Sequence, residues 1–177
     1  MKVLVTHASR HGSTAEIAAA IGSGIESRCR QHGYVVDVDV LPVARVRSVT
    51  EYDAVVLGSA VYVGHWLTPA RDLVRMFTSE LKAREVWLFS SGPIGDPPRP
   101  VEEPAEPAAL VGVLGAHEHR VLAGRLDRGH LRMAERLVVR AVHAHDGDYR
   151  DWDVVNGWAT EIADTLVRSS RHEHSDA

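Results

Sequence analysis

The beginning of the chain is the feature that most limits its fold. The apolar run Lys2–His7 reads as a β-strand and is followed by a short loop of small and hydroxyl residues. A strongly helix-forming segment with an apolar stripe, Ala15–Ile21, comes next. A helix that starts directly after a strand presents unpaired backbone N–H groups and a partial positive charge at its N-terminus. This segment therefore predicts an α/β domain with an anion site, most plainly a phosphate site.

The loop excludes two common phosphate-binding motifs. It has no Gly-Lys-Ser/Thr, so it is not a Walker A loop, and it lacks the three spaced glycines of the dinucleotide fingerprint. An ordinary helix capped by a hydroxyl side chain is the alternative interpretation. If the loop is a phosphate site, its whole length is expected to hold the anion: Ser9, Arg10, His11, Gly12, Ser13 and Thr14.

Strand and helix patterns alternate along the rest of the chain. Such an order predicts a doubly wound α/β fold with a five-stranded parallel sheet. After Lys2–His7, strands are expected over 34–40, 53–58, 85–90 and 119–123, and helices over 66–82 and 152–167.

Two further loops are expected at the same edge of the sheet, where ligands bind in such folds. One follows the third strand and is rich in aromatic residues between glycines, which suits a flat apolar ligand. Its candidate ligand-binding residues are Ser59, Ala60, Tyr62, Gly64 and Trp66, with His65 as a candidate proton donor or acceptor. The loop after the fourth strand adds Ser91, Gly92 and Ile94. The alternative for Tyr62 and Trp66 is that they cap the core.

The residues of the first loop carry a family resemblance. The pattern Ser-x-x-Gly-x-Thr-x-x-x-Ala, formed by Ser9, Gly12, Thr14 and Ala18, resembles the flavodoxin signature for the phosphate of flavin mononucleotide (FMN). His7 departs from it, because an aromatic residue is usual at that position. With residues 59–65 and the Asp151-Trp152 pair, the chain resembles the flavodoxin-domain group of menaquinone-dependent protoporphyrinogen IX dehydrogenases. The resemblance implies a flavodoxin-like three-layer fold whose five parallel strands follow the order 2-1-3-4-5. It also implies FMN as cofactor and electron transfer from a porphyrinogen to a quinone.

Three segments depart from a short flavodoxin-like domain spanning residues 1–168. Residues 97–107 are rich in proline and glutamate and predict an exposed linker, and residues 169–177 predict a disordered tail. Residues 124–150 form an insert with arginines at 125, 128, 132, 136 and 140. This basic amphipathic pattern suits contact with substrate carboxylates or with an anionic membrane surface, although an ordinary surface helix has the same pattern.

Composition excludes several other classes. The net charge of −4 argues against nucleic-acid binding, and the single cysteine, Cys29, argues against disulfides and thiolate metal sites. The histidine pairs do not match a metal-ligand pattern. The expected location is the cytoplasm, and peripheral contact with the inner face of the membrane is the alternative considered. The function predicted is an FMN-dependent oxidoreductase that acts on a porphyrinogen or quinone, and a homodimer is among the partners considered. A flavodoxin-type electron carrier and a non-catalytic binding module are the alternatives.

Overall fold

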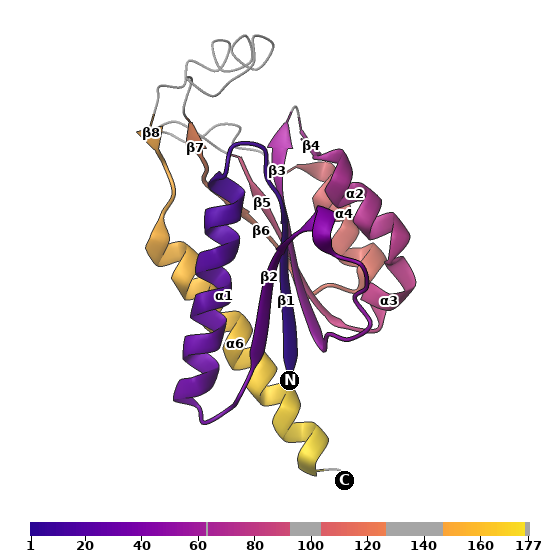
Figure 1. Ribbon diagram of the computed structural model, residues 1–177, viewed down its shortest axis with the longest axis vertical. Coiled ribbons are helices and arrows are strands. Elements are labelled where there is room, and N and C mark those ends of the chain that lie inside the picture. The colour runs from indigo at the N-terminus through magenta and orange to yellow at the C-terminus, as the bar shows by residue number, and fades with distance from the viewer. Residues whose placement is uncertain (63, 93–103, 127–146, 176–177) are drawn as a thin grey trace.

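The computed structural model describes residues 1–62, 64–92, 104–126 and 147–175. A parallel sheet lies between two layers of helices (Figure 1). The strands follow the order β2-β1-β3-β5-β6, which confirms the predicted 2-1-3-4-5 order once the short antiparallel strand β4 is set aside. The five parallel strands are β1 (Lys2–Ala8), β2 (Asp37–Pro42), β3 (Ala54–Tyr62), β5 (Glu85–Ser91) and β6 (His119–Leu122).

Helices α1 (Ser13–Gln31) and α6 (Trp152–Ser175) cover one face of the sheet (Figure 1). The opposite face is covered by α2 (Thr68–Met76), α3 (Thr78–Lys82), α4 (Ala105–Leu114) and the short 3-10 helix η1 (Val43–Arg45). Alternate residues of β1 supply the two cores: Val3 and Val5 pack towards α1 and α6, whereas Leu4 packs towards α2. Period-two alternation in a strand buried on both faces explains why β1 reads as a continuous apolar run.

Strand β3 is longer than the sequence indicates, because Gly58 does not end it. A Cβ at Gly58 would lie 2.0 Å from Cζ of Phe89, so the glycine lets this ring cross the strand closely. A glycine inside a strand often marks such a close approach. The strand continues to Tyr62 and turns back into β4 (His65–Trp66), which means that most of the predicted second loop is a β-hairpin.

Two helical predictions need correction. The expected helix over 66–82 is divided into α2 and α3 at Phe77, whose φ of −116° and ψ of 25° leave the helical region. The predicted linker over 97–107 contains the first turn of α4, in which Pro107 is buried. Proline is tolerated there because the N–H groups of a first helical turn have no partner within the helix. Residues 97–103 lie outside the described residues.

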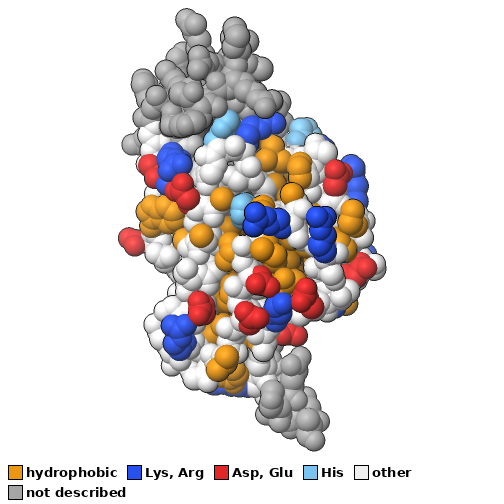
Figure 2. Space-filling model, in the orientation of Figure 1, with side chains coloured by type: hydrophobic (Ala, Val, Ile, Leu, Met, Phe, Trp, Pro, Cys, Tyr) orange, Lys and Arg blue, Asp and Glu red, His pale blue; other side chains and the backbone are white. Residues whose placement is uncertain are grey.

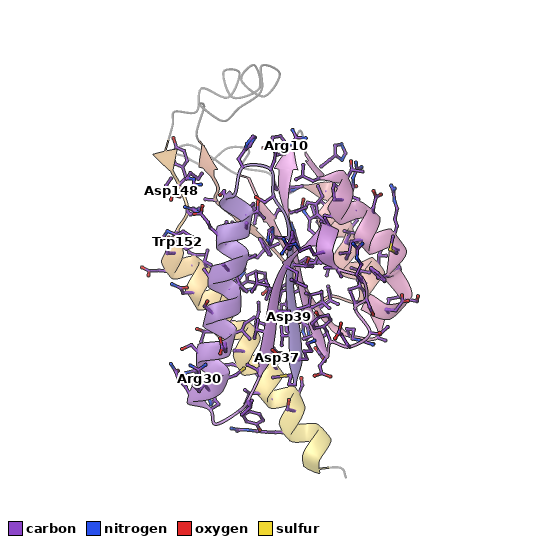
Figure 3. The ribbon with its side chains drawn as sticks, in the orientation of Figure 1. Arg10, Arg30, Asp37, Asp39, Asp148 and Trp152 are labelled. Atoms are coloured by element: carbon purple, nitrogen blue, oxygen red, sulfur yellow. The ribbon has the colours of Figure 1, made fainter. Side chains whose placement is uncertain are left out.

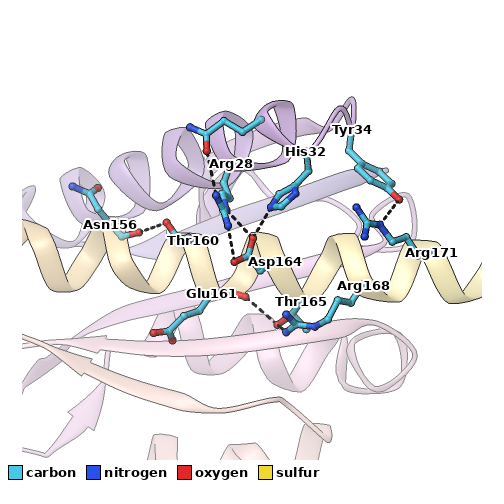
Figure 4. Close-up of polar contacts among 11 residues, drawn as sticks. Arg28, His32, Tyr34, Asn156, Thr160, Glu161, Asp164, Thr165, Arg168 and Arg171 are labelled. Atoms are coloured by element: carbon cyan, nitrogen blue, oxygen red, sulfur yellow. Dashed lines mark hydrogen bonds and ion pairs between the residues drawn. The ribbon is translucent and has the colours of Figure 1, made fainter.

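The last helix also extends further than expected, through Ser175, so residues 169–175 prolong α6 instead of forming a disordered tail. The hydroxyl of Ser170 donates a hydrogen bond to the carbonyl of Leu166, which satisfies it without breaking the helix. Arg171 lies 5.9 Å from the ring of Tyr34 and donates to its hydroxyl at 3.3 Å (Figure 4). Contacts with the domain therefore continue past residue 168.

The contact between α1 and α6 combines close packing with one charged cluster. A Cβ at Gly24 would lie 2.7 Å from Cβ of Ala159, so the two helices approach closely at this glycine. Further along, Arg28 donates two hydrogen bonds to the carboxylate of Asp164, and His32 lies 3.0 Å from the same group (Figure 4). No helix in the described ranges is long and apolar enough to cross a membrane.

Candidate functional site

The N-terminus of α1 is the centre of the candidate site. Gly12 is its N-cap residue with a φ of +88°, a conformation that glycine adopts without strain, and no side chain caps the helix. The N–H of Gly12 donates to the hydroxyl of Ser9 at 3.1 Å, which closes the loop on itself. Within the described part of the chain, the backbone N–H groups of the first turn are thus left without a side-chain acceptor, as an anion site requires.

The two hydroxyl residues after Gly12 do not cap the helix. The hydroxyl of Ser13 accepts a hydrogen bond from the backbone N–H of Arg125 at 3.1 Å, and the side chain of Thr14 is buried at 1% exposure. An ordinary capped helix, the alternative interpretation of this loop, is therefore not what forms. Among the described residues, a Cβ placed on Gly12 would meet two side-chain atoms within 4 Å, at 3.8 and 3.9 Å, which is ordinary van der Waals contact.

Polar groups lie buried where β1 enters the loop. The hydroxyl of Thr6 and Nδ1 of His7 are buried without a hydrogen-bond partner among the described residues. Burial lowers the pKa of His7 below its ordinary value, which favours the neutral imidazole at neutral pH. His7 lies where the resemblance to flavodoxins leads us to expect an aromatic residue. It places a neutral imidazole at the strand end, and no described residue forms a hydrogen bond with its Nδ1.

The β3–β4 hairpin forms a second side of the site. The ring of Tyr62 is half-buried, and the guanidinium of Arg10 lies 4.8 Å from its centroid. Arg10 belongs to the predicted phosphate loop (Ser9–Thr14) and lies at the C-terminal edge of the sheet (Figure 3). Tyr62 pairs with His65 across the turn, and Gly64 in that turn has a φ of +78°. The structure therefore brings the first and second predicted loops into direct contact through one arginine and one aromatic ring.

The end of β5 forms the third side. The register places Ala8, Ser59 and Ser90 on neighbouring strands, and Ala60 beside Ser91. Gly92 follows, and a Cβ there would lie 3.2 Å from Cβ of Val61. The three segments thus meet at one edge of the sheet, as expected from parallel strands. Ile94, the remaining candidate from this loop, lies outside the described residues.

Two of the candidate ligand-binding residues in the second loop are buried in the core and have structural roles. Trp66 is 2% exposed, packs in the core under α2, and donates its indole N–H to the hydroxyl of Ser90 at 2.8 Å. Its large apolar ring is stabilised by burial, so the core interpretation applies to it. Ser59 is fully buried, and its hydroxyl accepts from the N–H of Leu67 at 3.0 Å. This bond fixes the start of α2 relative to β3.

His65 lies on the outer strand of the hairpin. Its Nδ1 is 3.1 Å from a carboxylate oxygen of Glu106, and its side chain is 65% exposed. The same carboxylate accepts from the backbone N–H of Trp66 and pairs with Arg71 at 3.6 Å. The structure therefore places His65 against the carboxylate of Glu106 on α4, and its predicted role as a proton donor or acceptor stays a prediction.

The sequence did not predict a charged cluster that lies beside the predicted phosphate loop. Glu16, in the first turn of α1, pairs with Arg150 at 2.7 Å and with Arg125 at 3.0 Å, and Arg150 also pairs with Asp148. Hydrogen bonds from Arg150 hold the pKa of both carboxyl groups below their ordinary values. Figure 3 shows Asp148 beside the start of α1. The pattern along the chain gives no signal for this cluster, because its members lie up to 134 residues apart.

Two short strands form the base of the predicted insert. Strand β7 (Arg125–Leu126) pairs in antiparallel fashion with β8 (Gly147–Asp148). The residues between them, which include Arg128, Arg132, Arg136 and Arg140, lie outside the described residues. At the end of the described part that carries β7 and β8, Figure 2 shows Lys or Arg and His side chains, with Asp or Glu side chains beside them. The N–H of Arg125 donates to the hydroxyl of Ser13, so β7 lies next to the loop Ser9–Thr14.

Comparison with known proteins identifies the family. Residues 4–153 match the flavodoxin domain. The chain belongs to the flavodoxin domain family. It is 23% identical to the protoporphyrinogen IX dehydrogenase [quinone] of Escherichia coli strain K12, over 92% of this chain and 95% of that protein. This distant similarity covers most of both chains.

Solved flavodoxins share the fold. A flavodoxin from the domain Archaea superposes with a TM-score of 0.63 at 20% identity, covering 94% of this chain and 99% of the other. A mutant flavodoxin from Pseudomonas aeruginosa gives a TM-score of 0.58 at 17% identity, with coverages of 94% and 99%. Flavodoxin domains typically bind FMN. The uncapped N-terminus of α1 and the half-buried Tyr62 in this flavodoxin domain fit the phosphate and the ring system of that cofactor, respectively.

Proposed function

We propose that this flavodoxin domain is an FMN-dependent oxidoreductase. The observation that carries the proposal is the N-terminus of α1, where Gly12 leaves the first helical turn without a side-chain cap. A phosphate there accepts hydrogen bonds from the backbone N–H groups and is favoured by the helix dipole. The residues that would hold it are Ser9–Thr14, as the sequence predicts.

The flavin ring would lie between the hairpin and the end of β5. Tyr62 offers a flat apolar face, and Ala60, Gly64, Ser91 and Gly92 line the neighbouring backbone. When bound, FMN supplies the electron-transfer chemistry, while the protein orients the ring and limits its access to water. We further propose that the exposed His65, held by Glu106, exchanges protons with solvent beside the ring.

The reaction we propose is oxidation of protoporphyrinogen IX with a quinone as acceptor. Its support is the similarity to the Escherichia coli enzyme over most of both chains. The insert over 124–150 extends the proposal, because its arginines at 128, 132, 136 and 140 suit either the carboxylates of such a substrate or an anionic membrane that holds a quinone. Binding to vesicles with and without anionic lipid separates these two roles of the insert.

The cofactor is tested by titration of the purified protein with FMN. We expect a yellow holoprotein and quenching of FMN fluorescence on binding. Replacing Thr14 with Asp places a carboxylate at the phosphate and should abolish binding, and Ser13→Asp should do so at a less buried position. Thr68→Asp is the matched control, since it adds the same charge to the exposed start of α2. A wild-type protein that leaves FMN fluorescence unchanged would contradict the proposal.

The enzymatic activity is tested separately. The bound flavin is first reduced anaerobically and then mixed with a menaquinone analogue, and the oxidised protein is mixed with protoporphyrinogen IX. An enzyme of the proposed class reacts with both and turns over when they are supplied together. An electron carrier of the flavodoxin type would bind FMN but would show no turnover with this pair, which would refute the enzymatic part of the proposal.

A further inference from the structure

Arg125 is placed against the phosphate loop by its own backbone. It opens β7, and its N–H donates to the hydroxyl of Ser13 at 3.1 Å. Its Nη2 lies 3.9 Å from the position that a Cβ on Gly12 would occupy. The guanidinium therefore lies at the side of the loop, in van der Waals range of the position that a side chain at Gly12 would take.

In the structure this guanidinium is paired with Glu16. One guanidinium nitrogen lies 3.0 Å from one carboxylate oxygen, and the other donates to the second oxygen at 3.2 Å. Both side chains are substantially exposed, at 37% for Arg125 and 45% for Glu16. Ion pairs with this exposure contribute little to stability, so Arg125 can exchange its partner at small cost.

Glu16 does not depend on Arg125 for its charge balance. Arg150 donates to Glu16 at 2.7 Å, and its side chain is only 3% exposed. It is held in place by Asp148 and by the ring of Trp152, which lies 4.5 Å away. Glu16 thus pairs with two arginines. The side chain of Arg150 is buried and held by its other contacts, whereas that of Arg125 is exposed and can turn to another partner.

From this arrangement we propose that Arg125 is a ligand of the phosphate bound at the N-terminus of α1. Its guanidinium leaves Glu16 for the phosphate, while Arg150 continues to neutralise Glu16. A phosphate carries more negative charge than a carboxylate and accepts both arms of a guanidinium. The inference rests on the proposed binding of FMN and adds a cationic ligand from outside the loop.

Comparison of FMN with riboflavin, which lacks the phosphate, tests this role directly. Dissociation constants are measured by flavin fluorescence for the wild type, for Arg125→Gln and for Arg30→Gln. Arg30 is the matched control, because it is an exposed arginine in an ion pair at the other end of α1. We expect Arg125→Gln to weaken FMN about tenfold and to leave riboflavin unchanged, since one charge-assisted contact is lost. We expect Arg30→Gln to change neither.

A second pair of variants separates a phosphate ligand from a residue that only neutralises Glu16. In a Glu16→Gln background there is no carboxylate to neutralise, so a purely balancing role predicts that Arg125→Gln no longer affects FMN. A phosphate ligand predicts that the loss of about tenfold persists. Protection from thermal unfolding by inorganic phosphate gives a flavin-free readout, which should decrease in Arg125→Gln and not in Arg30→Gln.

The outcomes distinguish this inference from the proposed function. If the wild type binds no FMN, the proposed function fails. If it binds FMN and Arg125→Gln weakens FMN and riboflavin equally, or neither, the proposed function stands and Arg125 is not a phosphate ligand. Loss of the effect in the Glu16→Gln background would likewise overturn the inference.

Discussion

Replacing Gly58 with Ala is expected to destabilise the protein strongly. The added Cβ would lie 2.0, 2.1 and 2.5 Å from three ring atoms of Phe89, which is the residue paired with Gly58 on β5. Phe89 is fully buried and packs edge-on against Trp158 at 6.0 Å, so its ring has no free space into which it can move. The methyl group must therefore displace packed core atoms or separate two central strands.

The size of the effect follows from the cost of overpacking. Such substitutions cost about 1–3 kcal/mol, and a collision with the body of a ring places this one at about 3 kcal/mol. That is a large part of the roughly 5–15 kcal/mol that stabilises a typical domain. For a chain of this length we expect the melting temperature to fall by about 6–12 °C.

The assay is denaturant unfolding followed by circular dichroism, with calorimetry for the melting temperature. Gly112→Ala is the control: apart from its chain neighbours and its own helix backbone, no atom of the described residues lies within 4 Å of a Cβ at Gly112, and alanine in α4 should stabilise by about 0.5–1 kcal/mol. Phe89→Leu should partly rescue Gly58→Ala, so the double variant should be more stable than additivity predicts. An unfolding free energy for Gly58→Ala within about 0.5 kcal/mol of the wild type would refute the reasoning.

Two further predictions concern α1 and its contact with α6. Hydrogen bonds from Arg28 hold the pKa of Asp164 below its ordinary value, so its stabilisation is complete above about pH 4 and is lost as the pH falls through the lowered pKa. Asp164→Asn should therefore destabilise by about 1 kcal/mol at pH 7 and approach the wild type in strong acid, as measured by urea unfolding at several pH values; a constant difference would contradict this. Cys29 is fully buried, and burial raises the pKa of its thiol, so a thiol reagent should react with it far more slowly in the native protein than in denaturant. Equal rates would show that the helix contact opens readily.

Local patterns predicted the fold and the position of the first loop. The apolar run of β1 and the helix formers after Gly12 are adjacent in sequence, so a loop between a strand and a helix start could be expected there without long-range information. The parallel sheet follows from the alternation of strands and helices, and its strand order follows from the resemblance to flavodoxins. What the sequence could not show was which aromatic residues face the site, since Trp66 and Tyr62 have similar chemistry and only packing sends Trp66 into the core.

The charged cluster was beyond prediction for a different reason. Glu16 reads as an ordinary acidic residue in a first helical turn, and Arg150 as a polar residue before the last helix. Their pairing depends on where β8 returns to the domain, and that is a property of the tertiary structure. Pro107 contributed to the wrong prediction of a linker over 97–107. Proline is unfavourable inside helices, but this rule does not apply in the first turn, where Pro107 lies in α4.

The pairing of β7 with β8 has a consequence for how such a domain can change in evolution or by design. Arg125 lies opposite Asp148 and Leu126 opposite Gly147, so the two ends of the intervening segment are already adjacent. The entropy of closing a loop grows slowly with its length, and most of that cost is met once the ends are joined. Segments of very different length and composition can therefore be exchanged at this stem without any change to the sheet or to the loop Ser9–Thr14.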